Sequence, residues 1–146
     1  MPYELTMGGN ESRINFTGLL TYREIEELAE NSKIETLQFH SPVDPRNWPR
    51  LEQCLFSKRP DIALRIYSHP AETCDLTFVQ EMPSLQRFVA DCLTDVSNAD
   101  AIAKLEHLRE LSIGVYELKS FDFLHVVSDK LEVLHLERLK SKRSAC

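Results

Sequence analysis

The residue types that most often carry chemistry, histidine and cysteine, are scattered along this chain. They are His40, His69, His107, His125 and His135, with Cys54, Cys74, Cys92 and Cys146. No two cysteines have CxxC spacing, so the spacing indicates neither a zinc site nor a redox motif. The sequence also has no HExxH, no GxSxG and no glycine-rich phosphate loop. We therefore expect no catalytic residue, no metal, no cofactor and no enzymatic activity.

The chemical environment of the cysteines supports the same expectation. Asp91 precedes Cys92, and a nearby carboxylate disfavours the thiolate that a nucleophilic cysteine needs. We expect the cysteines to be small buried residues. The N-terminus has no apolar segment behind a basic start, so we expect a cytoplasmic protein with reduced thiols.

Composition and charge limit the classes of partner that this chain is expected to bind. The net charge is −6, and phosphate binding needs a basic face, so we do not expect nucleic acid as a partner. No apolar run approaches the roughly 20 residues of a membrane helix, so we expect no membrane partner. A soluble chain of 146 residues is the size of one ordinary domain.

A repeat of apolar residues is the strongest pattern in the sequence. LRELSI at 108–113 returns as LEVLHL at 131–136, 23 residues later. The pattern apolar-x-x-apolar-x-apolar fits six segments, which begin at residues 11, 34, 61, 85, 108 and 131. Of their 18 slots 16 are apolar, the exceptions being Glu11 and Asp61. Such a period predicts stacked units, with parallel strands on one face and helices or loops on the other. Leu111 and Leu134 are expected to be central core residues.

The segments before and between the repeats predict further elements. Tyr3–Met7 and Arg13–Thr17 alternate in polarity around Gly8–Asn10, which predicts a β-hairpin that caps the first unit. A helix is expected over Thr21–Asn31, with Thr21 and Glu24 as a capping box.

The middle of the chain is harder to interpret because prolines interrupt it. A short helix is expected over 48–56, capped by Asn47 or Ser41, with Trp48 either in the core or as an exposed anchor; the core is favoured. Residues 70–81 are expected to be irregular. A helix capped by Ser97 or Asn98 is expected to run to about residue 107. Leu118, Phe121, Phe123 and Leu124 are expected to form an apolar set on the convex side.

These residues resemble the leucine-rich-repeat family, from Arg13 onward and most clearly over 85–136. The resemblance implies a single α/β domain, 1–146: a right-handed solenoid with a parallel sheet, a hairpin cap over 1–20 and repeats over 21–146. The family pattern continues to an Asn or Cys in the turn after each strand. Here the corresponding residues are Leu19, Pro42, His69, Leu93, Tyr116 and Leu139.

The N-terminal stretch MPYELTMGGNESRINFTGLLTYREIEEL also loosely resembles the opening of a STAS domain of the anti-sigma-factor-antagonist type. That resemblance implies a regulatory module switched by phosphorylation, with four or five strands in mixed pairing. The serine loop of that family is absent, because Phe39–Asp44 stands in its place.

The residues between the core slots are expected to point out from the sheet, where solenoids commonly bind their partners. Tyr67 with Arg65 and Arg87 is the expected hot spot, and Asp91, Glu110 and Glu137 the acidic counterpart. The candidate partner-binding residues are Gln38, His40, Arg65, Tyr67, Arg87, Asp91, Glu110 and His135. The expected function is therefore non-catalytic binding of a protein partner. Since no polar cap follows the last repeat, a homodimer or a continuation through the C-terminal end is a further expectation.

Overall fold

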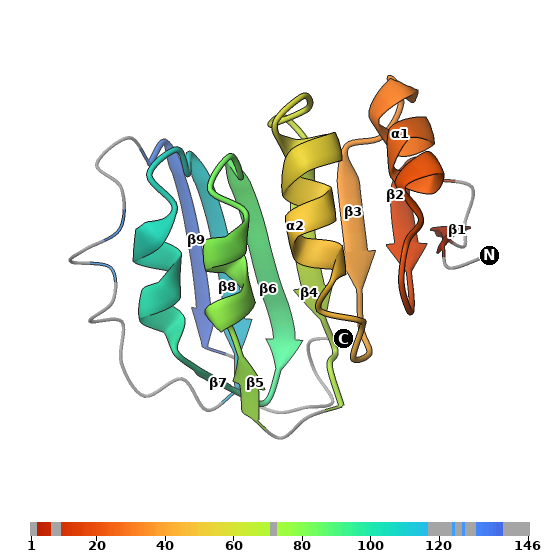
Figure 1. Cartoon of the computed structure of the whole chain (residues 1–146). Coiled ribbons are helices and arrows are strands. Elements are labelled where there is room, and N and C mark those ends of the chain that lie inside the picture. Colours follow the sequence, from red (N-terminus) through yellow and green to blue (C-terminus); the bar gives the residue numbers. More distant parts are fainter. Residues whose placement is uncertain are drawn as a thin grey trace.

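The chain forms one large sheet covered on one face by helices (Figure 1). The computed structural model describes residues 3–6, 10–70, 73–116, 124, 127 and 131–138. Seven strands lie in the order β1-β2-β3-β4-β6-β8-β9. Their bounds are β1 Tyr3–Thr6, β2 Asn10–Phe16, β3 Thr36–Phe39, β4 Ala63–Tyr67, β6 Arg87–Leu93, β8 Glu110–Val115 and β9 Val133–Arg138.

The strands from β2 to β9 are all parallel, and their register matches the predicted repeat. Residues in the middle slot of each unit pair with one another across the whole sheet: Ile14, Leu37, Leu64, Phe88, Leu111 and Leu134. This agreement confirms the six predicted strands and the α/β class with a mostly parallel sheet. It also means that the apolar slots of every unit point to the same face.

The N-terminal strands pair as the sequence predicts. β1 is antiparallel to β2, with Tyr3 opposite Phe16 and Leu5 opposite Ile14. Residues 7–9, which include most of the expected turn, lie outside the described part of the chain. The edge of the sheet at this end is thus a strand of only four residues.

The helices connect the strands on the core side (Figure 1). They are α1 Tyr22–Glu30, α2 Asn47–Leu51, the π-helical segment η1 Glu52–Phe56, and the 3-10 helices η2 Thr77–Glu81 and η3 Ala99–Lys104. The capping box of α1 is confirmed: the Glu24 N–H donates to Thr21 Oγ1 at 3.1 Å, and the Thr21 N–H donates to Glu24 Oε1 at 2.9 Å.

Two expectations for the middle of the chain are wrong. The segment over 70–81 is not simply irregular, because β5 (Thr73–Asp75) pairs in parallel with β7 (Asp95–Ser97) before η2 begins. The helix after Asn98 is a short 3-10 helix, and the Asn98 amide donates to Asp75 Oδ1 at 2.9 Å instead of capping it. Three-residue strands are too short to leave a polarity period.

An aromatic cluster fills the core between β3, α2 and η2. Trp48 is 5% exposed, which confirms its assignment to the core. Its ring stacks on Phe78 with centroids 4.7 Å apart and contacts Phe39 at 5.4 Å. Offset and edge-on ring pairs of this kind add to the free energy gained by burial.

The two clearest repeats differ in burial. Leu111 is 1% exposed, as expected, whereas Leu134 is 47% exposed, so its assignment to the central core is wrong. Leu134 lies on β9, the last of the described strands of the sheet, which pairs with β8 alone among them. Of the expected convex-side set, Leu118, Phe121 and Phe123 lie outside the described residues, whereas Leu124 is partly buried and packs against the core.

This topology differs from the one that the STAS resemblance implies. The described sheet has seven strands, and those from β2 to β9 are parallel and follow one another in chain order, instead of four or five in mixed pairing. None of the described helices is long and apolar enough to cross a membrane.

Candidate binding face

The face of the sheet opposite the helices carries a connected set of polar side chains, which we call the polar ladder. It consists of Asn15, Gln38, Arg65, Tyr67 and Asp91, from four neighbouring strands β2, β3, β4 and β6. The parallel register places Asn15 opposite Gln38 and Gln38 opposite Arg65. The structure thus brings together four of the eight predicted site residues, with Asn15 added.

The hydrogen bonds of the polar ladder run from one strand to the next. Asn15 Oδ1 accepts from Gln38 Nε2 at 3.0 Å and from the Tyr67 hydroxyl at 2.8 Å. Gln38 Oε1 accepts from Arg65 Nη1 at 3.2 Å. Arg65 then makes a bidentate pair with Asp91, with both N···O distances 3.0 Å. Such two-pronged pairs fix the orientation of both side chains.

Aromatic contacts complete the polar ladder. The guanidinium carbon of Arg65 lies 4.4 Å from the centre of the Tyr67 ring. The ring of His40, the residue directly after β3, has its centre 5.5 Å from that of Tyr67. Gln38 is only 1% exposed, although it is on the outward face. These hydrogen bonds and ring contacts fix the positions of Tyr67 and Arg65. Side chains that are already fixed lose less entropy when another molecule binds to them.

The remaining predicted residues lie apart from the polar ladder. Arg87 Nε donates to Glu110 Oε2 on β8, and Arg87 Nη1 donates to the Asp61 carbonyl at 2.9 Å. His135 Nε2 lies 3.9 Å from Glu137 Oε2 on β9. Arg87 and Arg65 therefore belong to two separate ion pairs.

The acidic residues do not form the expected separate area. Asp91 pairs with Arg65, Glu110 pairs with Arg87, and Glu137 lies beside His135. Among the described residues of this face, each of these three carboxylates thus lies beside a basic side chain. The strand period predicts the outward positions, and the register sets Arg87 opposite Glu110, but the diagonal pair of Arg65 with Asp91 depends on how far their side chains reach.

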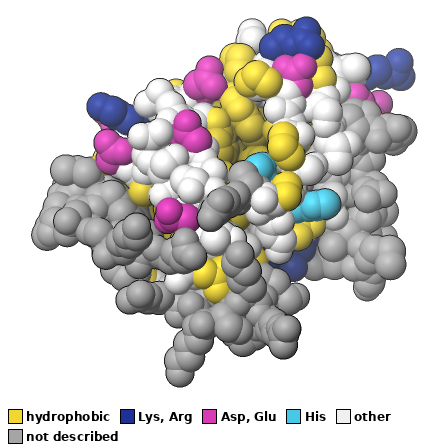
Figure 2. Space-filling view, turned by 90° about the horizontal axis from the view of Figure 1, so that it is seen from below, with side chains coloured by type: hydrophobic (Ala, Val, Ile, Leu, Met, Phe, Trp, Pro, Cys, Tyr) yellow, Lys and Arg dark blue, Asp and Glu magenta, His cyan; other side chains and the backbone are white. Residues whose placement is uncertain are grey.

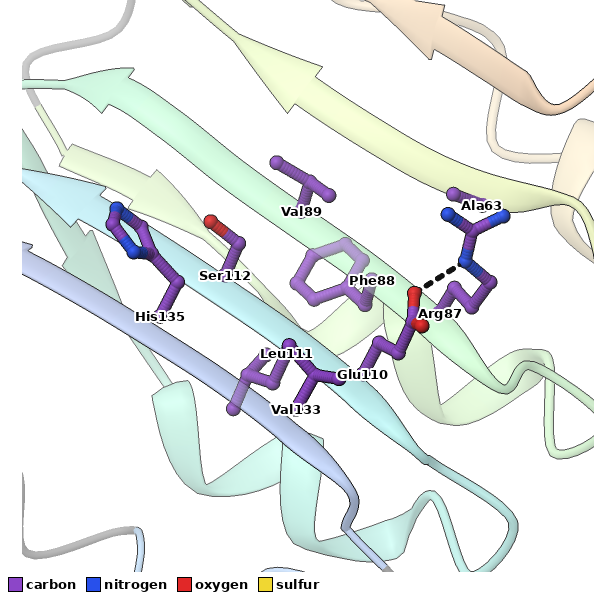
Figure 3. Close-up of a pocket in the computed structure, with 9 residues that line it drawn as sticks. All are labelled: Ala63, Arg87, Phe88, Val89, Glu110, Leu111, Ser112, Val133 and His135. Atoms are coloured by element: carbon purple, nitrogen blue, oxygen red, sulfur yellow. Dashed lines mark hydrogen bonds and ion pairs between the residues drawn. The ribbon is translucent and has the colours of Figure 1, made fainter.

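A small hollow in the sheet face lies between the Arg87–Glu110 pair and His135 (Figure 3). Its volume is about 100 Å³. Val89, Ser112 and His135 lie side by side on β6, β8 and β9 in this view. We call it the sheet-face hollow; it is lined by Ala63, Arg87, Phe88, Val89, Glu110, Leu111, Ser112, Val133 and His135. Small-molecule pockets are about 300–1,000 Å³, so this hollow suits a single side chain.

A second depression lies near the ends of β3 and β4, and its volume is about 210 Å³. Apolar side chains form a band across this end of the molecule, with histidines beside it (Figure 2). The lining includes Trp48, Phe78, His69 and Cys74. Burial, and secondarily Asp75, raises the pKa of the Cys74 thiol to about 11. Its thiol is thus protonated at neutral pH and a poor nucleophile.

Lowering the pH is expected to destabilise the fold through His69. Burial, and secondarily the charge of His40, lowers the pKa of His69 below its usual 6.5. The unfolded chain then binds this proton more readily than the folded chain, so the free energy of unfolding falls as the pH drops below about 6.5. Urea unfolding between about pH 7 and pH 5 should show a shallower fall in His69→Gln. His107→Gln, at an exposed position, should keep the wild-type slope; equal slopes in all three proteins would contradict the assignment.

The fold and face together define an α/β chain with a mostly parallel sheet, one face of which carries an ordered polar surface. The sequence matches no protein-family model and no curated protein. Among the described residues, no three His, Cys, Asp or Glu side chains are grouped so as to hold a metal ion.

The cysteines differ in their state. Cys54 and Cys74 are free thiols. Cys92 is disulfide-bonded, contrary to the expectation that its thiol is reduced.

Proposed function

We propose that this chain is a non-catalytic interaction module of the leucine-rich-repeat type, and that it binds a protein partner through the exposed face of its parallel sheet. The sequential parallel strands at intervals of 23 to 27 residues support the repeat architecture. The observation that carries the binding proposal is the polar ladder, which holds Tyr67 and Arg65 in fixed positions on an open face.

The chemistry of the face indicates the kind of partner. Tyr and Arg are favoured anchors in protein interfaces, and the sheet-face hollow beside them accepts one apolar side chain of a partner. Positive and negative side chains lie near the sheet-face hollow, in the ion pairs Arg65–Asp91 and Arg87–Glu110. A partner surface with charges of both signs therefore fits better than a uniformly acidic or basic one. The proposed partner is a folded protein or peptide in the cytoplasm, with no nucleic acid, no membrane, no cofactor and no catalysis involved.

Filling the sheet-face hollow is expected to remove partner binding. Val89→Arg places a long charged side chain where Val89 now lines the hollow and should weaken capture of the partner by about tenfold or more. The measurement is quantitative mass spectrometry of proteins retained on the immobilised chain, followed by titration with the purified partner. Glu26→Arg, an exposed change on α1, is the matched control. Equal retention by the wild type and both variants would contradict the proposal.

A further inference from the structure

We infer that β9 is a self-association edge, which pairs in antiparallel fashion with β9 of a second copy of this chain. Among the described strands, β9 is the end of the sheet and pairs with β8 alone. A sheet edge presents unpaired N–H and C=O groups to any strand that can align with them. The inference does not rest on the proposed function, because it uses the backbone edge of β9 and not the polar ladder.

The exposure of β9 singles this edge out. Val133 is 51% exposed and Leu134 is 47% exposed, and they point to opposite faces of the sheet. Tyr22 is the only other large apolar side chain in the described residues with comparable exposure. Natural sheet edges are commonly protected by charge, proline or a short strand. β9 has six residues and no proline, its first four include Val133, Leu134 and Leu136, and its charged residues stand only at its C-terminal end.

The backbone of β9 limits the possible registers. The Val133 N–H donates to the Arg109 carbonyl at 3.0 Å, on the β8 side. Successive peptide groups alternate between the two sides of a strand, so the groups of Leu134 and Leu136 face the open edge. If a second copy pairs in antiparallel fashion with Leu134 opposite Leu136, the N–H and C=O groups of these two residues form a hydrogen-bonded pair. The arrangement is two-fold symmetric, so the same pair forms twice.

The side chains select the same register. With Leu134 opposite Leu136, the chain direction sets Glu132 opposite Arg138 and His135 opposite the His135 of the other copy. Leu134 of each copy then lies opposite Leu136 of the other, and Glu132 lies opposite Arg138 at both ends of the paired strands. Cross-strand apolar and opposite-charge pairs are the units that stabilise antiparallel sheets. A shift by two residues between the copies, the smallest that keeps the same backbone groups paired, instead sets Leu134 opposite Arg138 or Leu136 opposite Glu132.

The register is tested by cross-linking. His135 lies on the two-fold axis as a non-hydrogen-bonded pair, in which Cα atoms are about 4.5 Å apart, within the range of about 4.4–6.8 Å for a disulfide. His135→Cys should therefore form a disulfide-linked dimer of the full chain on mild oxidation. Ser112→Cys, the register neighbour of His135 on the inner strand β8, is the matched control. Cross-linking of His135→Cys no faster than of Ser112→Cys or of the wild type overturns the inference.

The pairing of Glu132 with Arg138 is tested by exchanging the two charges. Glu132→Arg or Arg138→Glu alone should weaken the dimer by about 2- to 30-fold, because each change replaces two attractive pairs with two repulsive ones. The double variant Glu132→Arg with Arg138→Glu should restore wild-type association in analytical ultracentrifugation, and Glu30→Arg on α1 should have no effect. A double variant as weak as the single ones, or a wild type that is monomeric at every concentration, overturns the inference.

Discussion

Leu111→Ala is expected to lower the free energy of unfolding by about 2–5 kcal/mol. Leu111 is 1% exposed and lies on β8, with Phe88 on one side and Leu134 on the other in the sheet register. Removing its side chain loses the transfer free energy of the buried atoms and leaves a cavity that neighbouring strands cannot close. Urea denaturation followed by circular dichroism measures the change.

Leu134→Ala is the matched control, because it makes the same chemical change at the equivalent position of the next repeat. Leu134 is 47% exposed, so the loss should be no more than about 1 kcal/mol. Equal and large losses at both positions would show that Leu134 is buried in solution. Self-association through β9 would bury it further, so both variants should be compared at low protein concentration.

The repeat itself was predictable because its physical basis is local to each unit. An apolar slot must face the core wherever it occurs, so Leu64 and Phe88 show their burial in the sequence. The register follows as well, since stacked units of similar length pair residue by residue. The capping box of α1 depends only on Thr21 and Glu24, and it was predictable for the same reason.

What the sequence does not show is the conformation of the turns between units. Gly18, Ser68 and Cys92 each stand two residues after the last apolar slot of a strand, and all three have φ between 48° and 60°. Glycine adopts this region freely, whereas Ser and Cys do so at a cost. The Asn or Cys of the leucine-rich-repeat pattern is missing from the turn after each strand, but a residue with positive φ recurs in three of these turns. Only the glycine gives a signal in the sequence.

The candidate site was predictable as a set of positions and only in part as a set of pairs. Outward positions follow from the strand period, so Arg65 and Tyr67 were identified correctly as neighbours. Arg87 pairs with Glu110, its register neighbour on β8, whereas the pair of Arg65 with Asp91 is diagonal between β4 and β6 and depends on side-chain reach. Gln38 is buried on this outward face and hydrogen-bonded to Asn15 and Arg65, and no sequence pattern predicts that burial.

Asn47 shows how a polar residue in the core can connect two repeats. The sequence suggests a helix cap, but the structure places Asn47 at 0% exposure, bonded to the preceding unit. Its Oδ1 accepts from the Leu20 N–H at 2.8 Å, and its Nδ2 donates to the Gly18 carbonyl at 2.7 Å. The loop after β2 is thus tied to the start of α2, which is 27 residues further along the chain.

Asn47→Ala is expected to lower the free energy of unfolding by about 1–3 kcal/mol. The Gly18 carbonyl keeps a second donor, the Asp44 N–H at 3.1 Å, so the loss comes mainly from the Leu20 N–H, which would be buried without an acceptor. Gln53→Ala, at an exposed polar position on the adjoining η1 segment, should change the stability by less than about 0.5 kcal/mol. Hydrogen exchange of the Leu20 amide should accelerate in Asn47→Ala by more than global destabilisation explains. An unchanged Leu20 amide would mean that the loop is held by its packing and not by Asn47.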